Sequence, residues 1–186
     1  MNGNLEPSGG LLNSQLSSSK DAVLTTNYLD DYIVRGNVFS VSLAQAFTAG
    51  TAIYFTSEIS APDELTAAFL LPIQANPTEG FLILNIYEDT EYTGGTPITP
   101  VNRNRNSSNT AKTTVLAGAT GATEGTLIYT GVFGSAASGG FFGGISGGGT
   151  GNSANSIVVD MNKKYLYELT NSETATVGIN AEFTEI

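Results

Sequence analysis

The sequence predicts an all-β protein, an antiparallel β-sandwich or jelly roll with an extended N-terminal arm. From Gly36 onward, short runs of residues alternate between apolar and polar side chains with a period of two. Gly, Asn and Pro punctuate these runs at short intervals, as turns require. No helical period lasts long enough to indicate a parallel α/β sheet. We therefore assign residues 1–35 to an arm and residues 36–186 to the sandwich domain.

The first strand shows the alternation most clearly. Phe39, Val41 and Leu43 fall on one face of an extended chain, and small or polar residues fall on the other. Eight more strands are predicted, at residues 52–57, 67–73, 81–88, 113–116, 126–133, 156–161, 165–171 and 176–184. Turns are predicted between them, among others at Asn76-Pro77, Gly94-Gly95, Gly118, Gly121 and Asn171-Ser172. Nine short strands are typical of a sandwich or a jelly roll.

The N-terminal arm has a different composition. Residues 1–19 are rich in Asn, Gly, Ser and Leu and show no period, so the segment buries too little apolar surface to fold alone. We interpret it as a strand or strap that docks on a neighbouring chain; the alternative is packing on its own domain. The expected anchors are Leu5, Leu11, Leu12 and Leu16. Residues 20–35 fit a short helix or two extended segments, and we expect extended structure with one helical turn at most.

The absence of two residue types excludes several kinds of chemistry. The chain has no cysteine, and hence no disulfide, thiolate nucleophile or cysteine metal site. It has no histidine, which removes the commonest general base and the Ser-His-Asp triad. Acidic pairs such as Asp30-Asp31 and Asp63-Glu64 do not follow the D-x-[DN]-x-[DN]-G calcium loop. We therefore expect no enzyme, no catalytic residue, no cofactor and no metal site.

Charge and hydropathy also limit the partners. Seventeen acidic and seven basic residues give a net charge of −10, which repels nucleic acid and anionic lipid. No run approaches the roughly 20 apolar residues that cross a bilayer. The first ten residues lack the basic and apolar regions of a signal peptide, which predicts folding inside a cell. We expect neither nucleic acid nor membrane as a partner.

A glycine-rich segment stands out at residues 131–151. It holds ten of the 22 glycines and carries Phe141 and Phe142 at its centre. It lacks the lysine of a phosphate-binding loop. One interpretation is a flexible surface loop. The other is an interface loop whose two phenylalanines insert into a neighbouring subunit, because adjacent exposed aromatic residues are a solubility liability.

The run Asn102-Arg-Asn-Arg-Asn-Ser-Ser-Asn109 is the most distinctive segment. Asparagine side chains bond to nearby backbone and so order irregular loops. Arg103 and Arg105 would share one face of an extended strand, and Lys112 adds a third positive charge. The loop is either self-contained, with arginines paired to Glu88, Asp89 or Glu91, or it contacts the carboxylates of a neighbouring subunit around a symmetry axis.

This run and its surroundings carry a family resemblance. Residues 87–110, the strand Gly125-Thr-Leu-Ile-Tyr129, the glycine-rich loop, Tyr165-Leu-Tyr-Glu-Leu-Thr-Asn171 and Ile179-Asn-Ala-Glu-Phe183 resemble a group of small virion proteins of tailed bacteriophages, often encoded among the head genes. The resemblance covers roughly residues 38–186, and the Asn/Arg/Ser run is its most specific part.

The resemblance implies a structural role without enzymatic activity. We expect a head decoration, or cement, protein that binds the major capsid protein on the outer surface of the virion after assembly in the host cytoplasm. We also expect a homo-oligomer, with a trimer at local three-fold axes. The alternatives are another virion part, such as a head fibre, a tail or baseplate component or a receptor-binding protein, and a carbohydrate-binding sandwich unrelated to virions.

Overall fold

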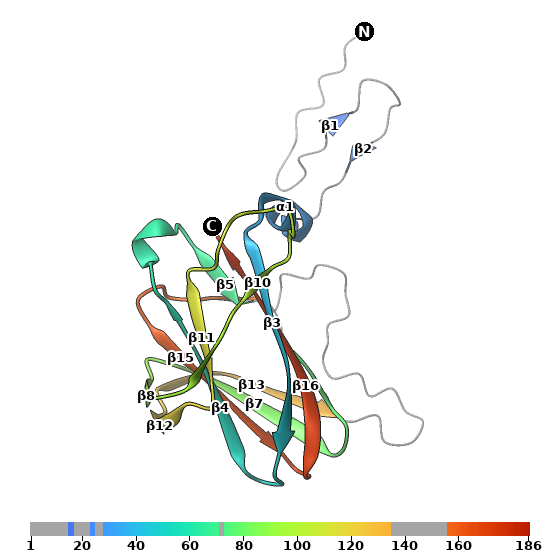
Figure 1. The fold of residues 1–186 in the computed structure, drawn as a ribbon, viewed down its shortest axis with the longest axis vertical. Helices are drawn as coiled ribbons and strands as arrows, with labels where there is room; N and C mark the ends of the chain where they lie inside the picture. The colour runs from blue at the N-terminus through green and yellow to red at the C-terminus, as the bar shows by residue number, and fades with distance from the viewer. Residues whose placement is uncertain (1–14, 17–22, 25–27, 71–72, 135–155) are drawn as a thin grey trace.

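Two six-stranded antiparallel sheets face each other and enclose the main core (Figure 1). The computed structural model describes Gln15, Leu16, Val23, Leu24 and residues 28–70, 73–134 and 156–186. The predicted all-β sandwich is confirmed.

The strands divide between the sheets as follows. The first sheet has the order β10 (Val101–Asn102), β3 (Val38–Phe47), β16 (Ala175–Glu185), β5 (Ala68–Leu70) and β14 (Ile157–Val158), and β6 (Gln74–Pro77) also pairs with β16. The second sheet has the order β13 (Thr126–Gly134), β7 (Phe81–Glu88), β15 (Lys164–Asn171), β4 (Ala52–Ile59), β11 (Thr113–Ala117) and β9 (Thr96–Ile98). Two ribbons lie outside the sheets, β8 (Glu91–Thr93) with β12 (Thr120–Thr123), and β1 (Gln15–Leu16) with β2 (Val23–Leu24). The helices are α1 (Tyr28–Arg35) and the short 3₁₀ helix η1 (Pro62–Glu64).

The pairing of these strands is that of a jelly roll. Strands from opposite ends of the domain form antiparallel pairs: β3 with β16, β4 with β15, β5 with β14, and β7 with β13. The four pairs amount to one long double-stranded ribbon that is rolled so that successive segments alternate between the two sheets. The segment from β8 to β12 is an insertion between β7 and β13, and it extends the edges of both sheets through β9, β10 and β11.

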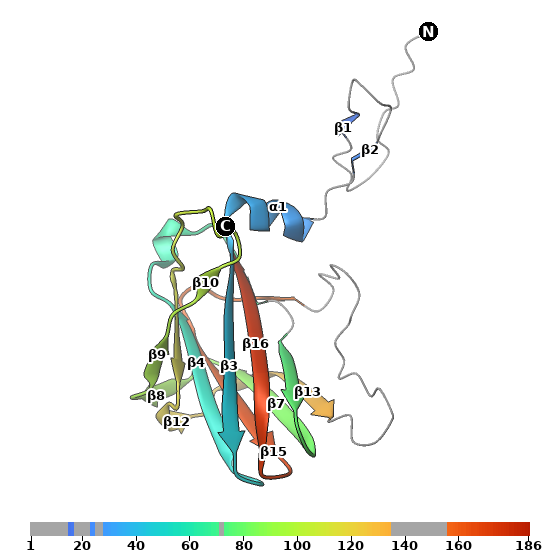
Figure 2. The ribbon, with the colours of Figure 1, turned by 45° about the vertical axis from the view of Figure 1, so that its right-hand side comes forward.

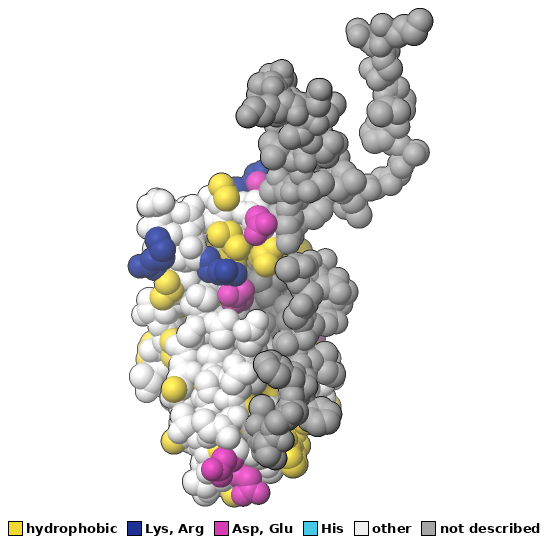
Figure 3. Space-filling view, turned by 90° about the vertical axis from the view of Figure 1, so that its right-hand side faces the viewer, with side chains coloured by type: hydrophobic (Ala, Val, Ile, Leu, Met, Phe, Trp, Pro, Cys, Tyr) yellow, Lys and Arg dark blue, Asp and Glu magenta, His cyan; other side chains and the backbone are white. Residues whose placement is uncertain are grey.

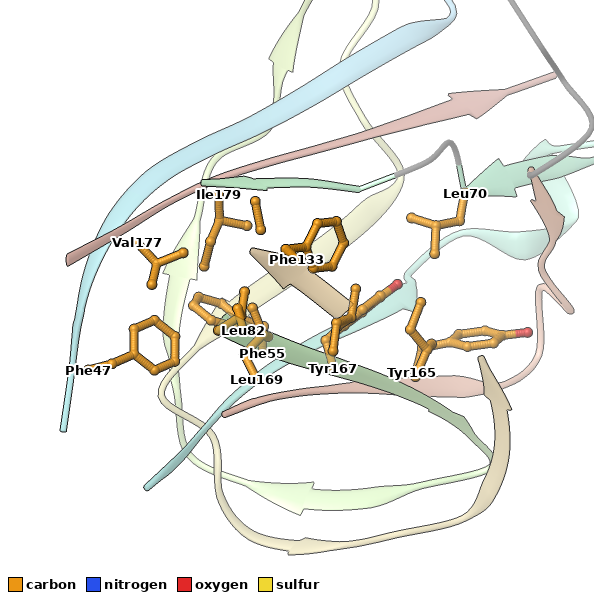
Figure 4. Packing of buried hydrophobic residues seen from close by; sticks show 13 residues of the cluster. Phe47, Phe55, Leu70, Leu82, Phe133, Tyr165, Tyr167, Leu169, Val177 and Ile179 are labelled. Atoms are coloured by element: carbon orange, nitrogen blue, oxygen red, sulfur yellow. The ribbon is translucent and has the colours of Figure 1, made fainter. Parts of the chain in front are cut away.

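Alternating side chains fill the space between the sheets (Figure 4). Strand β7 contributes Leu82, Leu84 and Ile86 to this core, and β15 contributes Tyr167 and Leu169. Each of these side chains is buried, and burial of one such residue stabilises the fold by about 1.5–3 kcal/mol. A second, smaller cluster lies beside the first, where the rings of Phe39 and Phe183 stack with centroids 5.7 Å apart.

Three buried tyrosines keep their hydroxyl groups hydrogen-bonded. The Tyr167 hydroxyl lies 2.7 Å from Ser57 Oγ, Tyr165 donates to Glu88 Oε2 at 2.9 Å, and Tyr87 donates to Glu168 Oε2 at 3.1 Å. Burial raises the pKa of Tyr167 to about 12. Burial, and then the Glu168 carboxylate, raise the pKa of Tyr87 to about 12 as well. A phenolate at either position would lose its hydration, so the native state favours the protonated form.

The structure also corrects details of the sequence prediction. Residues 28–35 form a helix rather than extended chain, because Asp30 and Asp31 lie in its first turn and its last carbonyls are hydrogen-bonded by a distant loop. Asn76-Pro77 lies at the end of β6 rather than in a turn, since a strand edge tolerates proline. The predicted turns at Gly94-Gly95 and Gly118 are confirmed, each with a positive φ. Gly121 lies inside β12 rather than in a turn, because its positive φ forms part of an irregularity in the pairing of that strand. The short strands β8, β9, β10 and β12 were not predicted.

The buried tyrosines predict a loss of stability in alkali. In the unfolded chain they ionise near their ordinary pKa of 10.0, but in the native state Tyr87 and Tyr167 hold their protons until about 12. The stabilisation is therefore complete below pH 10 and falls as pH rises toward 12. Urea unfolding at a series of pH values, with tyrosinate absorbance recorded in parallel, measures this loss. The Tyr167→Phe variant should show a shallower fall, and a free energy of unfolding that is constant across this range would contradict the prediction.

Candidate interaction surface

The asparagine loop, residues 102–109, lies against the end of helix α1. The helix ends in a Schellman motif, in which the Gly36 N–H donates to Ile33 O and the Asn37 N–H donates to Tyr32 O, both at 2.9 Å. Gly36 takes the left-handed conformation this motif requires, with φ of 76°. Figure 2 shows α1 at the end of the sandwich where β16 and the chain terminate.

Three asparagine amides bond to the carbonyls that the helix and its cap leave free. Asn104 Nδ2 donates to Val34 O at 2.7 Å, and Asn102 Nδ2 donates to Gly36 O at 2.9 Å. Asn109 Nδ2 donates to Arg35 O at 3.3 Å. The last carbonyls of a helix have no intrahelical partner and need one from outside. The loop supplies these partners and fixes α1 to the domain.

The spacing of the asparagines also shapes the loop itself. The Asn104 N–H donates to Asn102 Oδ1 at 2.9 Å, and the Asn106 N–H donates to Asn104 Oδ1 at 3.0 Å. These are successive Asx turns, which require a side-chain oxygen two residues before each N–H. Each of Asn102 and Asn104 thus uses its oxygen within the loop and its nitrogen on the segment that ends α1. The sequence prediction that asparagines order this loop is confirmed.

Two carboxylates of β16 hold the flanks of the asparagine loop. Glu182 Oε2 accepts from Arg103 Nη1 at 3.0 Å. Glu185 is buried, and its carboxylate accepts from the N–H of Lys112 at 2.9 Å and the N–H and hydroxyl of Thr113 at 2.8 and 2.7 Å. A buried carboxylate is costly unless donors surround it, as they do here. The last strand therefore positions the loop, and the loop positions the helix.

The predicted basic residues have different surroundings from those expected. Arg103 pairs with Glu182, and Lys112 pairs with Glu64, whereas the proposed acceptors Glu88, Asp89 and Glu91 pair with Lys163 and Lys164. The prediction that the arginines pair with Glu88, Asp89 or Glu91 is wrong, because those three side chains lie beside the start of β15. Arg103 and Arg105 do not share a strand face either, since β10 ends at Asn102.

Arg105 differs from the other two predicted basic residues, Arg103 and Lys112, which both form ion pairs. It is exposed, and it forms no ion pair with any described residue. Val34 and Val101, which flank the same loop, are exposed over 72% and 45% of their surface. The sequence analysis missed both valines, which periodicity alone does not mark as exposed. Figure 3 shows Lys and Arg side chains together with hydrophobic ones toward one end of this face.

The other predicted contact residues are only partly described. Leu16 lies in β1 and pairs with Val23 of β2. The remaining ones, Leu5, Leu11, Leu12, Phe141 and Phe142, lie outside the described residues. Strand β13 ends at Gly134, so it includes the first residues of the segment predicted as a glycine-rich loop.

The described residues contain no group of three or more acidic, His or Cys side chains placed to hold a metal ion. Among them, no helix has the length and hydropathy needed to cross a membrane. An apolar cavity of about 70 Å³ lies between the sheets, lined by residues such as Leu43, Ile73 and Leu84. The Ser57 and Tyr167 hydroxyls in its wall bond to each other.

Comparison with known proteins adds no relative. No protein family model, curated protein or solved structure matches this chain. The features that bear on function are therefore the asparagine loop, the exposed residues around it and the sequence resemblance.

The buried carboxylate gives a first prediction for this site. Glu185→Ala removes the acceptor of three donors, and each buried donor left unsatisfied costs about 1–3 kcal/mol. We expect a loss on the order of 3 kcal/mol in the free energy of unfolding, measured in urea. The control is Glu124→Ala at an exposed position, which should change stability by less than about 0.5 kcal/mol. Equal effects of the two substitutions would refute the role of Glu185.

A pair of glycines tests how α1 is fixed. A Cβ on Gly36 would lie 2.1 Å from Ser107 Oγ, whereas a Cβ on Gly50 would meet nothing within 4 Å. Both have a positive φ, so Gly→Ala costs each about 1–2 kcal/mol. Gly36→Ala should cost about 1–3 kcal/mol more, because it displaces the asparagine loop.

Hydrogen exchange locates that additional loss. The amides of α1 should exchange faster in Gly36→Ala than in Gly50→Ala, while β15 stays protected in both variants. If the two variants lose the same stability and α1 exchanges alike in both, the loop does not fix the helix.

Proposed function

We propose that this chain is a structural protein of a tailed-bacteriophage virion that decorates the capsid shell and stabilises it. Its partner would be the major capsid protein on the outer surface of the head, with further copies of the same chain as neighbours. The chain would be made in the host cytoplasm and would act by binding, without a cofactor and without catalysis.

The observation that carries the proposal is the position of the asparagine loop. The segment on which the family resemblance is most specific is also the segment that bonds to the end of α1. Helix α1 is the last part of the predicted arm, residues 1–35, so the loop sets the point at which that arm joins the domain. A strap can resist displacement from a shell only if its root is fixed to the body that it holds. The arm's contacts with the shell would then hold the jelly roll in place as well.

The exposed residues around the loop suit a contact with another protein. The guanidinium of Arg105 is free to form a charge-assisted pair with a carboxylate of the capsid protein. Val34 and Val101 provide apolar surface beside it. A surface of this kind, an arginine flanked by aliphatic side chains, matches the composition of protein interfaces.

Decoration would stabilise the shell by mass action. A ligand that binds the closed shell and not its separated subunits lowers the free energy of the closed state by RT ln(1 + [L]/Kd) for each site. When one copy touches more than one capsid subunit, its second contact forms at a high effective concentration. The overall affinity for the shell is then higher than that of a single contact. Small contact areas are therefore sufficient to stabilise the shell, provided that the contacts are repeated over it.

Particle stability tests the proposal. Virions stripped of this protein should release their DNA at a lower temperature than intact virions, and adding the purified chain back should restore the original temperature. Stripped particles that are as stable as intact ones would overturn the cement role. The number of copies per particle separates the alternatives, because many copies over the shell favour decoration and a few copies at one vertex favour a fibre or tail part.

The same assay tests Arg105. Loss of a hydrogen bond to a charged group costs about 1.5–3 kcal/mol, so Arg105→Ala should require at least about tenfold more protein for the same restoration. The matched control is Arg35→Ala, which removes an exposed arginine that already pairs with Asp31 of its own helix at 2.7 Å. Equal titrations for both variants would exclude Arg105 from the contact.

A further inference from the structure

We propose that strand β13 is an interface between two copies of this chain, which join their β13 edges antiparallel about a two-fold axis. The proposal is independent of the virion role, because it rests on the edge of one sheet and would hold whatever else the protein binds. Its geometry also differs from the three-fold oligomer that the family resemblance implies.

The edges of the two sheets differ in length and composition. Natural sheets protect their edges with short strands, proline or charged residues, because an open edge pairs with other chains. In the described part of the chain, β10 and β14 have two residues each, β9 has three and contains Pro97, and β6 has four and ends at Pro77. Strand β13 has nine residues, TLIYTGVFG, without proline or charge. Of the strands that stand last in the two sheet orders it is the longest, and it has none of these protective features.

One side of β13 is already fixed by the sheet. It pairs with β7 along its whole length, from Thr126 opposite Glu88 to Gly134 opposite Phe81, with an irregularity between Leu127 and Tyr129. The strand order places no described strand on its other side. Backbone N–H and C=O groups on that side are therefore preformed for hydrogen bonds with an added strand, which is the mode of recognition known as β-augmentation.

The side chains of this edge are apolar and exposed. Leu127, Tyr129 and Val132 are exposed over 52%, 38% and 54% of their surface. Phe81, on the neighbouring strand beside the end of β13, is 47% exposed. Few of the large hydrophobic side chains in the described part of the chain are exposed, so an apolar group gathered along one edge strand indicates a contact surface.

The distribution of charge favours a second copy as the occupant. The chain carries a net charge of −10, so two copies repel each other over most of their surface. Residues 125–159 contain no charged residue at all, and β13 lies within this stretch. A two-fold contact must be self-complementary, since the same surface meets itself. An uncharged strand of apolar and threonine side chains meets this condition in antiparallel pairing.

Mass measurements on the full-length chain test this interface. Sedimentation velocity over a range of concentrations should show the wild type as a dimer. Val132→Lys should raise the dimer dissociation constant at least tenfold, because it places a charge of each copy in the apolar, uncharged contact. The matched control, Val158→Lys, changes an exposed valine (66% of its surface) on the short edge strand β14 and should leave the dimer intact. Unfolding curves verify that both variants fold.

Hydrogen exchange provides an independent readout. Amides of β13 that point away from β7 should become protected as wild-type protein is concentrated, and they should stay unprotected in Val132→Lys. A wild type that sediments as a single chain at every concentration would overturn the proposal and leave this edge for a strand of another protein. A trimer whose mass is unchanged in Val132→Lys would overturn it too. Neither result bears on DNA release from stripped virions, so the two proposals fail separately.

Discussion

The pairing of β16, the last strand, with β3, the first strand of the jelly roll, is the constraint on which the rest of this structure depends. Strand β16 pairs with β3 from Ala175 opposite Phe47 to Thr184 opposite Val38, and its other side receives β5 and β6. This pairing joins the two ends of the rolled ribbon, so it fixes the register of the first sheet over the core. Because its partners are distant in sequence, the chain must close a long loop before these contacts form. Side chains of the same strand then hold the insertion that carries the asparagine loop.

Polar contacts at the helix end form a hierarchy rather than a set of independent bonds. Glu182 and Glu185 of β16 position the flanks of the loop, and the loop amides then bond to the end of α1. A helix of eight residues is marginal in water, so its stability comes from these tertiary contacts. Each hydrogen bond contributes only about 1 kcal/mol net, but a wrong placement of β16 would remove all of them together. The root of the arm is therefore coupled to the centre of the first sheet.

The sequence could predict the strands because burial on one face leaves a period of two, as in Phe39, Val41 and Leu43. It could predict the jelly roll only as one of two architectures, since the pairing of distant strands leaves no local pattern. Helix α1 was missed because the bonds that complete its end come from Asn102, Asn104 and Asn109, about 70 residues further along the chain. The partner of Arg103 was missed for the same reason, because the sheet register places Glu182 beside it. The exposed edge was missed because periodicity reports which residues are apolar and not which strand is last in a sheet.

The ion pairs limit how this protein can associate. Of the six described basic residues, all but Arg105 pair with a carboxylate of the same chain, at Arg35, Arg103, Lys112, Lys163 and Lys164. The charge left over is negative, so long-range electrostatics oppose contact between copies, and salt weakens that opposition. Attraction between copies must then come from short-range forces, which are apolar burial and backbone hydrogen bonds. Strand β13 offers both without bringing carboxylates together.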